Sequence, residues 1–135
     1  MLGSAKYITL EAAKQMAAAG EAEARKNGWN VAIAIVDANG GLILFQKLDE
    51  TQPGSIAVAQ AKARTAALFK RSTKAMEEAV AAGKLAFLAV EGNLPMQGGL
   101  PVVVEGKVIG AVGVSGVTSA QDEQIADAVL RGLGV

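Results

Sequence analysis

The stretch NLPMQGGLPVVVEGKVIGAVGVSG, residues 93–116, combines two of the chain's three prolines with closely spaced glycines and a run of valines. Its first part, NLPMQGG, consists of residues that favour turns, whereas PVVVE (101–105) and KVIGAVGV (107–114) have the β-branched composition of strands. Because Gly106 separates the two valine-rich segments, the stretch predicts a β-hairpin that the chain enters through a tight loop.

Outside this stretch, the sequence predicts a second hairpin and several helices. The segments VAIAIVD and LILFQKL flank the turn DANGG, which is a typical hairpin pattern. Apolar periodicity predicts helices over residues 10–27, 56–70, 74–83 and 120–133. The apolar run LAFLAVEG (85–92) fits a short strand or a turn of buried helix, and the strand is the favoured interpretation. Hairpins between helices favour an α+β fold in which helices pack on an antiparallel sheet, with residues 1–135 as a single domain.

Polar residues and glycines mark the expected ends of the helices. Thr9 and Ser55 are predicted to cap the first and second helices, and Gly28 is predicted to end the first. Ser119 is predicted to cap the last helix, with Asp122 three residues later in an arrangement close to a capping box.

The composition excludes several classes of function. Thirteen basic and thirteen acidic side chains cancel, so no net field attracts nucleic acid or an anionic membrane. The lack of cysteine and histidine removes disulfides, thiolate nucleophiles, the usual zinc ligands and the commonest general base. The start, MLGSAKYITL, has no signal-peptide pattern, and no apolar run reaches the length of a membrane span. These features predict a cytoplasmic protein that binds neither nucleic acid nor membrane.

The apolar content predicts self-association. Hydrophobic residues make up 51% of the chain, yet only 4% are aromatic, and alanine, valine and glycine predominate. A small monomer of this composition has too few polar side chains to cover its surface, whereas a homo-oligomer buries the excess between subunits. The alanine-rich face of the helix between Ile56 and Phe69 is the expected interface.

The glycines at positions 110, 113 and 116 do not match a phosphate-binding loop. On their strand, Ala111, Gly113 and Ser115 share a face with little side-chain bulk, so another backbone or a ligand can come close. Close packing of a helix is the favoured interpretation, and approach of a ligand is the alternative. In the junction SGVTSAQDE, capping of the free amides by Ser119 and Asp122 is similarly favoured over anion binding.

The loop NLPMQGG sets a thioether and a carboxamide at the mouth of the expected sheet. Met96 is a soft ligand for haem iron and Gln97 can orient a polar substituent, although packing in a core is the commoner role of methionine. A planar ligand is therefore expected beside residues 94–100, near the amides that precede the last helix. The candidate ligand-binding residues are Met96, Gln97, Gly98, Gly99, Gly113, Ser115, Gly116 and Thr118.

The charged residues do not predict a catalytic centre. The densest basic group spreads around its helices, which predicts a solvated surface; it consists of Lys62, Arg64, Lys70, Arg71 and Lys74. The acidic candidates have no neighbouring base in the sequence; they are Asp37, Asp49, Asp122 and Glu123. The residues thus favour a small ligand-binding or assembly domain over an enzyme, and they predict no catalytic residue and no metal ligand set.

Four segments carry a resemblance to a known family: VAIAIVDANGGLILFQKLD, SIAVAQAKARTA, LPMQGGLPVVVEGKVIGAVGVSG and QDEQIADA. They resemble the family that includes GlcG-like proteins, haem-binding HbpS-like proteins and the C-terminal domain of PduO-type corrinoid adenosyltransferases, over nearly the whole chain. The resemblance implies a profilin-like fold, with an antiparallel sheet between helices, and a homo-oligomer that is commonly an octamer. It also implies binding of haem, corrinoid or a related small molecule, as an accessory to glycolate or diol metabolism.

Three functions agree with this resemblance: a tetrapyrrole-binding module, a haem-degrading enzyme and a purely structural accessory oligomer. The resemblance implies that histidine can serve as the iron ligand in haem-binding members, and this chain has no histidine. Ligation would then fall to Met96, to the hydroxyl of Ser115 or Thr118, or to a residue of a neighbouring subunit. The missing histidine strengthens the case for an accessory, metabolite-binding role.

Overall fold

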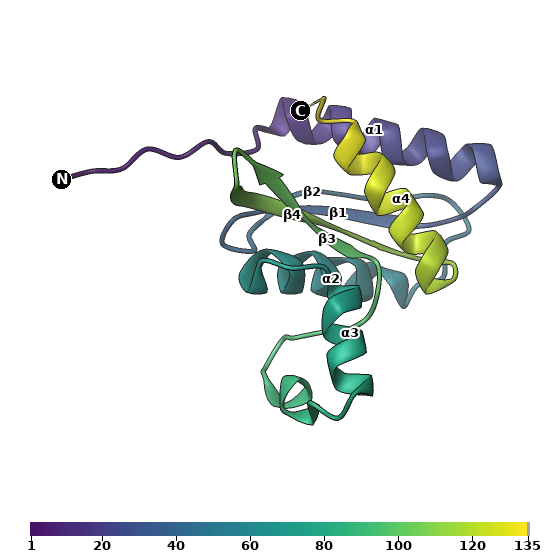
Figure 1. Cartoon of the computed structure of the whole chain (residues 1–135). Coiled ribbons are helices and arrows are strands. Elements are labelled where there is room, and N and C mark those ends of the chain that lie inside the picture. Colours follow the sequence, from purple (N-terminus) through teal and green to yellow (C-terminus); the bar gives the residue numbers. More distant parts are fainter. Residues whose placement is uncertain (135) are drawn as a thin grey trace.

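A four-stranded antiparallel sheet forms the centre of the protein, with the strand order β2-β1-β4-β3 (Figure 1). The computed structural model describes residues 1–134. The strands are β1 (Ala32–Asp37), β2 (Leu42–Lys47), β3 (Gly99–Val104) and β4 (Lys107–Ser115). The helices are α1 (Leu10–Asn27), α2 (Ser55–Phe69), α3 (Thr73–Ala81) and α4 (Ser119–Arg131), with a short 3-10 helix, η1 (Leu85–Ala89). The predicted α+β fold with an antiparallel sheet is confirmed.

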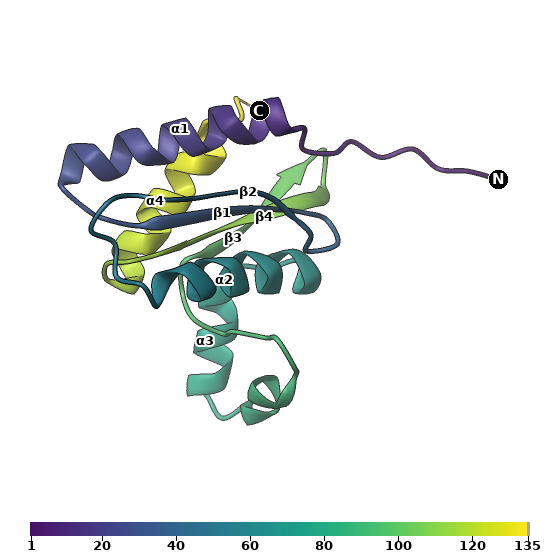
Figure 2. The same cartoon turned by 180° about the vertical axis from the view of Figure 1, so that it is seen from behind.

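Helices cover both faces of the sheet. α1 and α4 lie on one face and α2 lies on the other, as views from opposite sides show (Figure 1, Figure 2). The alternation of side chains along β1 explains this division: Ile33 and Ile35 join the core beneath α1 and α4, whereas Ala32 and Ala34 join the alanines of α2. α3 and η1 extend beyond α2, away from the sheet (Figure 1).

Small residues let α2 approach β4 closely. A Cβ atom at Gly113 would collide with the carbonyl oxygen of Ala59 and would lie 2.5 Å from the amide nitrogen of Ala63. Only glycine permits this contact between the backbones of a helix and a strand. The predicted close packing of a helix on this strand face is confirmed, and α2 occupies the space that a ligand would need.

Both predicted hairpins are present. β1 pairs with β2, and β3 pairs with β4. Glu105 and Gly106 have φ values of 52° and 76°, which is the pair of positive values that a type I′ turn requires. The predicted ends of the first helix are also confirmed, because Thr9 Oγ1 accepts a hydrogen bond from the Ala12 amide and Gly28 ends the helix with a φ of 71°.

The segment LAFLAVEG does not form the predicted strand. Leu85–Ala89 form η1, and Leu85 and Leu88 are exposed. The segment lies beyond α3, where no strand is available to pair with its backbone (Figure 1). The strand prediction is therefore wrong.

Two helix starts differ from the prediction. Thr118, and not Ser119, caps α4: its side chain accepts from the Gln121 amide, and the Gln121 side chain accepts from the Thr118 amide, which completes a capping box. α2 begins after Gly54 without a side-chain cap, and Ser55 accepts a hydrogen bond from Ser115 instead.

Candidate ligand-binding site

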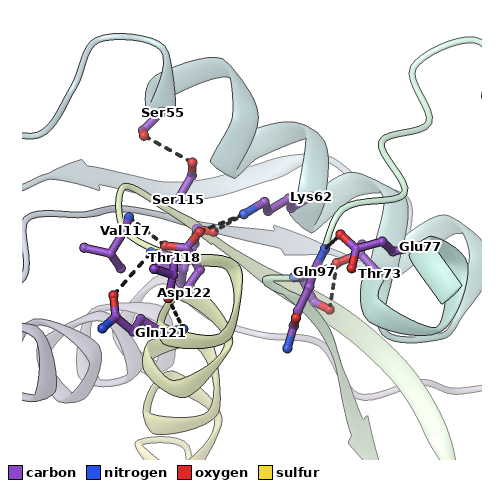
Figure 3. A network of polar contacts seen from close by, with 12 residues as sticks. Ser55, Lys62, Thr73, Glu77, Gln97, Ser115, Val117, Thr118, Gln121 and Asp122 are labelled. Carbon is purple, nitrogen blue, oxygen red and sulfur yellow. Dashed lines mark hydrogen bonds and ion pairs between the residues drawn. The ribbon is translucent and has the colours of Figure 1, made fainter. Parts of the chain in front are cut away.

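The loop that leads into β3 is held between α3 and α4 (Figure 3). The Gln97 amide donates to Glu77 Oε1 of α3 at 3.3 Å, and the Gln97 side chain donates to Glu123 Oε2 of α4 at 3.2 Å. The Gly99 amide donates to Thr73 Oγ1 at 2.8 Å. Because α3 holds the backbone and α4 holds the Gln97 side chain, the loop position depends on how these helices are placed.

A buried ion pair between Lys62 of α2 and Asp122 of α4 lies next to this loop (Figure 3). Lys62 Nζ and Asp122 Oδ2 are 3.0 Å apart, and the two side chains are 1% and 3% exposed. The helices that carry them lie on opposite faces of the sheet, so the pair connects the two helical layers. The other ion pairs found within residues 1–134 have exposed side chains.

The ammonium group of Lys62 also completes the hydrogen bonding at the end of the sheet. The Val114 amide donates to the Gly98 carbonyl at 3.0 Å, whereas the Val114 carbonyl accepts from Lys62 Nζ at 2.9 Å. β3 begins only at Gly99, and the ammonium takes the place of a strand amide at this carbonyl. Gly98 has a φ of 131°, and a Cβ atom there would lie 2.7 Å from Lys62 Nζ.

Asp122 is held by backbone amides as well as by Lys62. Its Oδ1 atom accepts from the Val117 amide at 3.1 Å. Burial raises the pKa of Asp122 above its ordinary value, while the positive charge of Lys62 and hydrogen bonds from Val117 and Gly116 act in the opposite direction. Each of the two buried charges therefore depends on the other for compensation.

We expect the pH dependence of stability to reflect the raised pKa of Asp122. A group with a raised folded-state pKa stabilises the protein fully below its unfolded pKa, and this contribution is lost as the pH rises through the folded value. The free energy of unfolding of the native protein should thus increase relative to that of Asp122→Asn as the pH falls from about 7 to about 4.

Denaturant titrations of the two proteins over this pH range measure the difference. Hydrogen bonds from Arg25 and Gln124 lower the pKa of Glu21 and Glu23, respectively. Both glutamates are present in both proteins, so their effects on the pH dependence cancel in the comparison. If the free energy of unfolding of the native protein instead fell relative to that of Asp122→Asn on acidification, Lys62 would lower the pKa of Asp122 below its unfolded value.

Among the predicted site residues, three keep accessible side chains. Met96 is 38% exposed, so it does not fill the core. Gln97 is partly buried between Glu77 and Glu123. Thr118 is exposed, but its hydroxyl caps α4.

The other predicted site residues are covered by the fold. Gly98 and Gly99 are buried against Lys62, and Gly113 is buried under α2. Ser115 is 6% exposed and its hydroxyl donates to Ser55 at 3.1 Å. The Gly116 backbone packs against the carbonyl of Asn30. These residues shape the end of the sheet, and their side chains and Cα positions face protein.

Sequence reasoning does not find the ion pair. The prediction of a solvated surface is wrong for Lys62, because this residue lies on the same stripe of α2 as Ala59, Ala63 and Ala66. Asp122 likewise belongs to the buried stripe of α4, which continues through Ile125, Ala126 and Val129. A charged residue on an apolar helical stripe is the signal that marks each of them.

An open groove of ≈ 550 Å³ lies beside the loop. Residues of α3, β3 and α4 line it, together with Ser72 before α3: Ser72, Lys74, Leu100, Ala120, Glu123, Gln124 and Asp127. Glu123 is the residue that accepts from Gln97, so the groove and the loop share a wall. The groove is in the region where the sequence predicts a ligand, near the first turns of α4.

The site offers amides, carboxylates, the buried ammonium of Lys62, the ammonium of Lys74 in the groove and the thioether of Met96. Within residues 1–134, no cluster of three or more acidic side chains is placed to bind a metal ion. In the same described part of the chain, none of the helices has both the length and the apolar character needed to cross a membrane.

The fold occurs in known proteins. A family model described as haem degrading protein HbpS-like matches residues 8–131. The chain belongs to the HbpS-like family. Protein GlcG of Escherichia coli (strain K12) is 46% identical over 108 residues, which are 80% of this chain and 81% of that protein. The resemblance to GlcG-like and HbpS-like proteins is confirmed.

Solved structures show how far the likeness to HbpS-like proteins extends. A crystal structure of a double mutant of Streptomyces reticuli HbpS has a TM-score of 0.92 at 32% identity, and the match covers 99% of this chain and 92% of that one. A crystal structure of a PduOC–haem complex has a TM-score of 0.87 at 24% identity and covers 94% and 95% of the two chains. At this lower identity, the second likeness shows a shared fold alone.

Proposed function

We propose that this HbpS-like protein is a cytoplasmic homo-oligomer that binds a tetrapyrrole beside the loop of residues 94–100, as an accessory to glycolate or diol metabolism. The proposal depends mainly on the groove lined by α3, β3 and α4, next to the loop in which Met96 is 38% exposed. Haem is the first candidate, because the description of the family model names haem and a structure of the same fold is a haem complex. A corrinoid is the related alternative.

The residues of the site fit a tetrapyrrole whose metal is weakly held. The Met96 thioether is a suitable ligand for haem iron, and the chain has no histidine. Ser115 is bonded to Ser55 and Thr118 caps α4, so Met96 is the ligand that we propose. In the groove, Lys74 can pair with a propionate carboxylate.

A haem titration followed by absorbance tests this function. We expect the native protein to bind with modest affinity and Met96→Ala to bind about tenfold more weakly, since loss of one metal ligand removes roughly 1.4 kcal/mol or more. Leu42→Ala is a matched control, because Leu42 is 52% exposed on the far edge strand β2. Its affinity should equal that of the native protein.

Variants of Gly98 and Gly99 are unsuitable for filling the site, because a Cβ atom at either position would collide with Lys62. Gln97→Ala serves as the second site variant. Equal affinity in the native protein, Met96→Ala and Gln97→Ala would place haem elsewhere. Breakdown of haem in the presence of a reductant or peroxide would favour a haem-degrading enzyme, and the lack of any spectral change would favour a structural accessory oligomer.

We also expect a stable homo-oligomer, with eight subunits as the number that the family resemblance implies. The alanine-rich face of α2, which the sequence predicts as the interface, packs through Ala59 and Ala63 on the sheet of its own subunit, so that prediction is corrected. The outer face of α2, where Ile56 and Leu68 are 38% and 51% exposed, is the interface that we propose instead. Light scattering should therefore give a mass of several subunits, and Leu68→Arg should weaken assembly at least about tenfold by placing an unpaired charge in the interface. Leu2→Arg adds the same charge to an exposed segment and should not. A monomer at micromolar concentration would exclude this assembly.

A further inference from the structure

We propose that the Lys62–Asp122 pair is a latch that positions the loop Asn93–Gly98, and that the loop loosens when both charges are removed although the rest of the fold persists. The inference rests on the proposed function only in its consequence for ligand binding. The latch itself is a property of the protein without ligand.

The first support is the place of the pair at the end of the sheet. Lys62 Nζ contacts the Val114 carbonyl and Asp122, and Gly98 packs directly against this ammonium. On the other side, Asp122 accepts from the Val117 amide. The pair therefore joins the end of the loop, the end of β4 and the turn before α4 in one connected set of contacts (Figure 3).

The second support is the kind of contact that the pair makes. A buried ion pair adds little net stability, and neutral replacements of similar volume are often tolerated. What a neutral pair does not reproduce is the directed hydrogen bond from Lys62 to the Val114 carbonyl at 2.9 Å. Without this donor, the carbonyl must find water or another partner at the point where the loop covers it.

The third support is the weak attachment of the loop elsewhere. Two of its amides bond to side chains of neighbouring helices: Leu94 donates to Thr65 Oγ1 at 2.9 Å and Gln97 donates to Glu77 at 3.3 Å. The amides of Asn93 and Met96 bond only to carbonyls two or three residues away in the chain. Within the described residues, Asn93 Oδ1 is a buried polar atom without a hydrogen-bond partner. A segment held by a few side-chain contacts opens at a lower free energy than the sheet, so it is where a lost contact takes effect.

Amide hydrogen exchange of the variant Lys62→Met/Asp122→Asn tests the latch. The carboxamide that replaces the carboxylate of Asp122 carries no charge but keeps an acceptor for the Val117 amide, which favours folding of the variant. We expect the Leu94, Gln97 and Gly99 amides to exchange at least about tenfold faster than in the native protein. The amides of β1 should keep their native rates.

Arg25→Met is the matched control, because it removes one charge from an exposed ion pair with Glu21. It should leave the exchange of the loop and of β1 unchanged. Two results would contradict the proposal. The loop amides of the double variant could exchange at the native rate, or they could exchange faster by the same factor as the amides of β1. Lys62→Leu/Asp122→Asn, which also removes the donor to the Val114 carbonyl, is the variant to measure if Lys62→Met/Asp122→Asn does not fold, with the same expected result.

A haem titration of the double variant separates this inference from the proposed function. We expect its affinity for haem to fall together with the protection of the loop. If the native protein binds no haem, the proposed function fails and the exchange experiment still decides the latch. If both proteins bind haem equally while the loop loosens, the pair does not position the binding site.

Discussion

Replacement of Gly113 by valine should lower the free energy of unfolding by more than about 3 kcal/mol or prevent folding altogether. Overpacking of a core typically costs about 1–3 kcal/mol, and here the new side chain meets backbone atoms of Ala59 and Ala63. A helix backbone cannot rotate aside as a side chain can, so α2 would have to move away from the sheet as a whole. Thermal or denaturant unfolding measures the loss.

Gly3→Val is the control for this substitution, because nothing lies within 4 Å of a Cβ atom at Gly3. It should unfold like the native protein. An unchanged melting temperature for Gly113→Val would mean that α2 does not pack on this face of β4, and it would reopen that face as a place for a ligand.

Lys62→Met should lower the free energy of unfolding by about 3–5 kcal/mol, because it leaves the carboxylate of Asp122 buried without its partner. Addition of Asp122→Asn should recover most of this loss, since the charge that lacks compensation is then removed as well. Denaturant titrations of the two single variants and the double variant form a complete cycle. Losses that add up in the double variant would show that the two side chains do not interact.

The sheet and most helices could be predicted because their signals are local. The turn DANGG and the Glu105–Gly106 turn define the hairpins, and the alternation along β1 assigns its two faces. The small side chains on one face of β4 were likewise sufficient to predict close packing of a helix at Gly113. The η1 segment could not be assigned in this way, because a short apolar run fits a strand or a helical turn equally well and only the position of α3 decides between them.

The central contact of the site could not be predicted, because it joins residues 60 positions apart. The sequence places Lys62 and Asp122 on apolar stripes of two helices, but their pairing requires that α2 and α4 meet at the end of the sheet. The start of β3 at Gly99 is equally necessary. Because the strand does not extend to Gly98, the Val114 carbonyl is free to accept a hydrogen bond from Lys62. Pro95 and the two glycines mark the loop as a turn in the sequence, whereas the need for glycine at position 98 comes from this tertiary contact with Lys62.

Hydrogen exchange of the native protein with and without haem, followed by mass spectrometry of its peptides, tests the proposed binding site most directly. The groove beside the loop predicts that haem slows exchange in peptides that cover residues 94–100 and the first turns of α4, while peptides from β2 keep their rates. Unchanged exchange at the loop and α4, with haem bound as judged by absorbance, would contradict the proposed site.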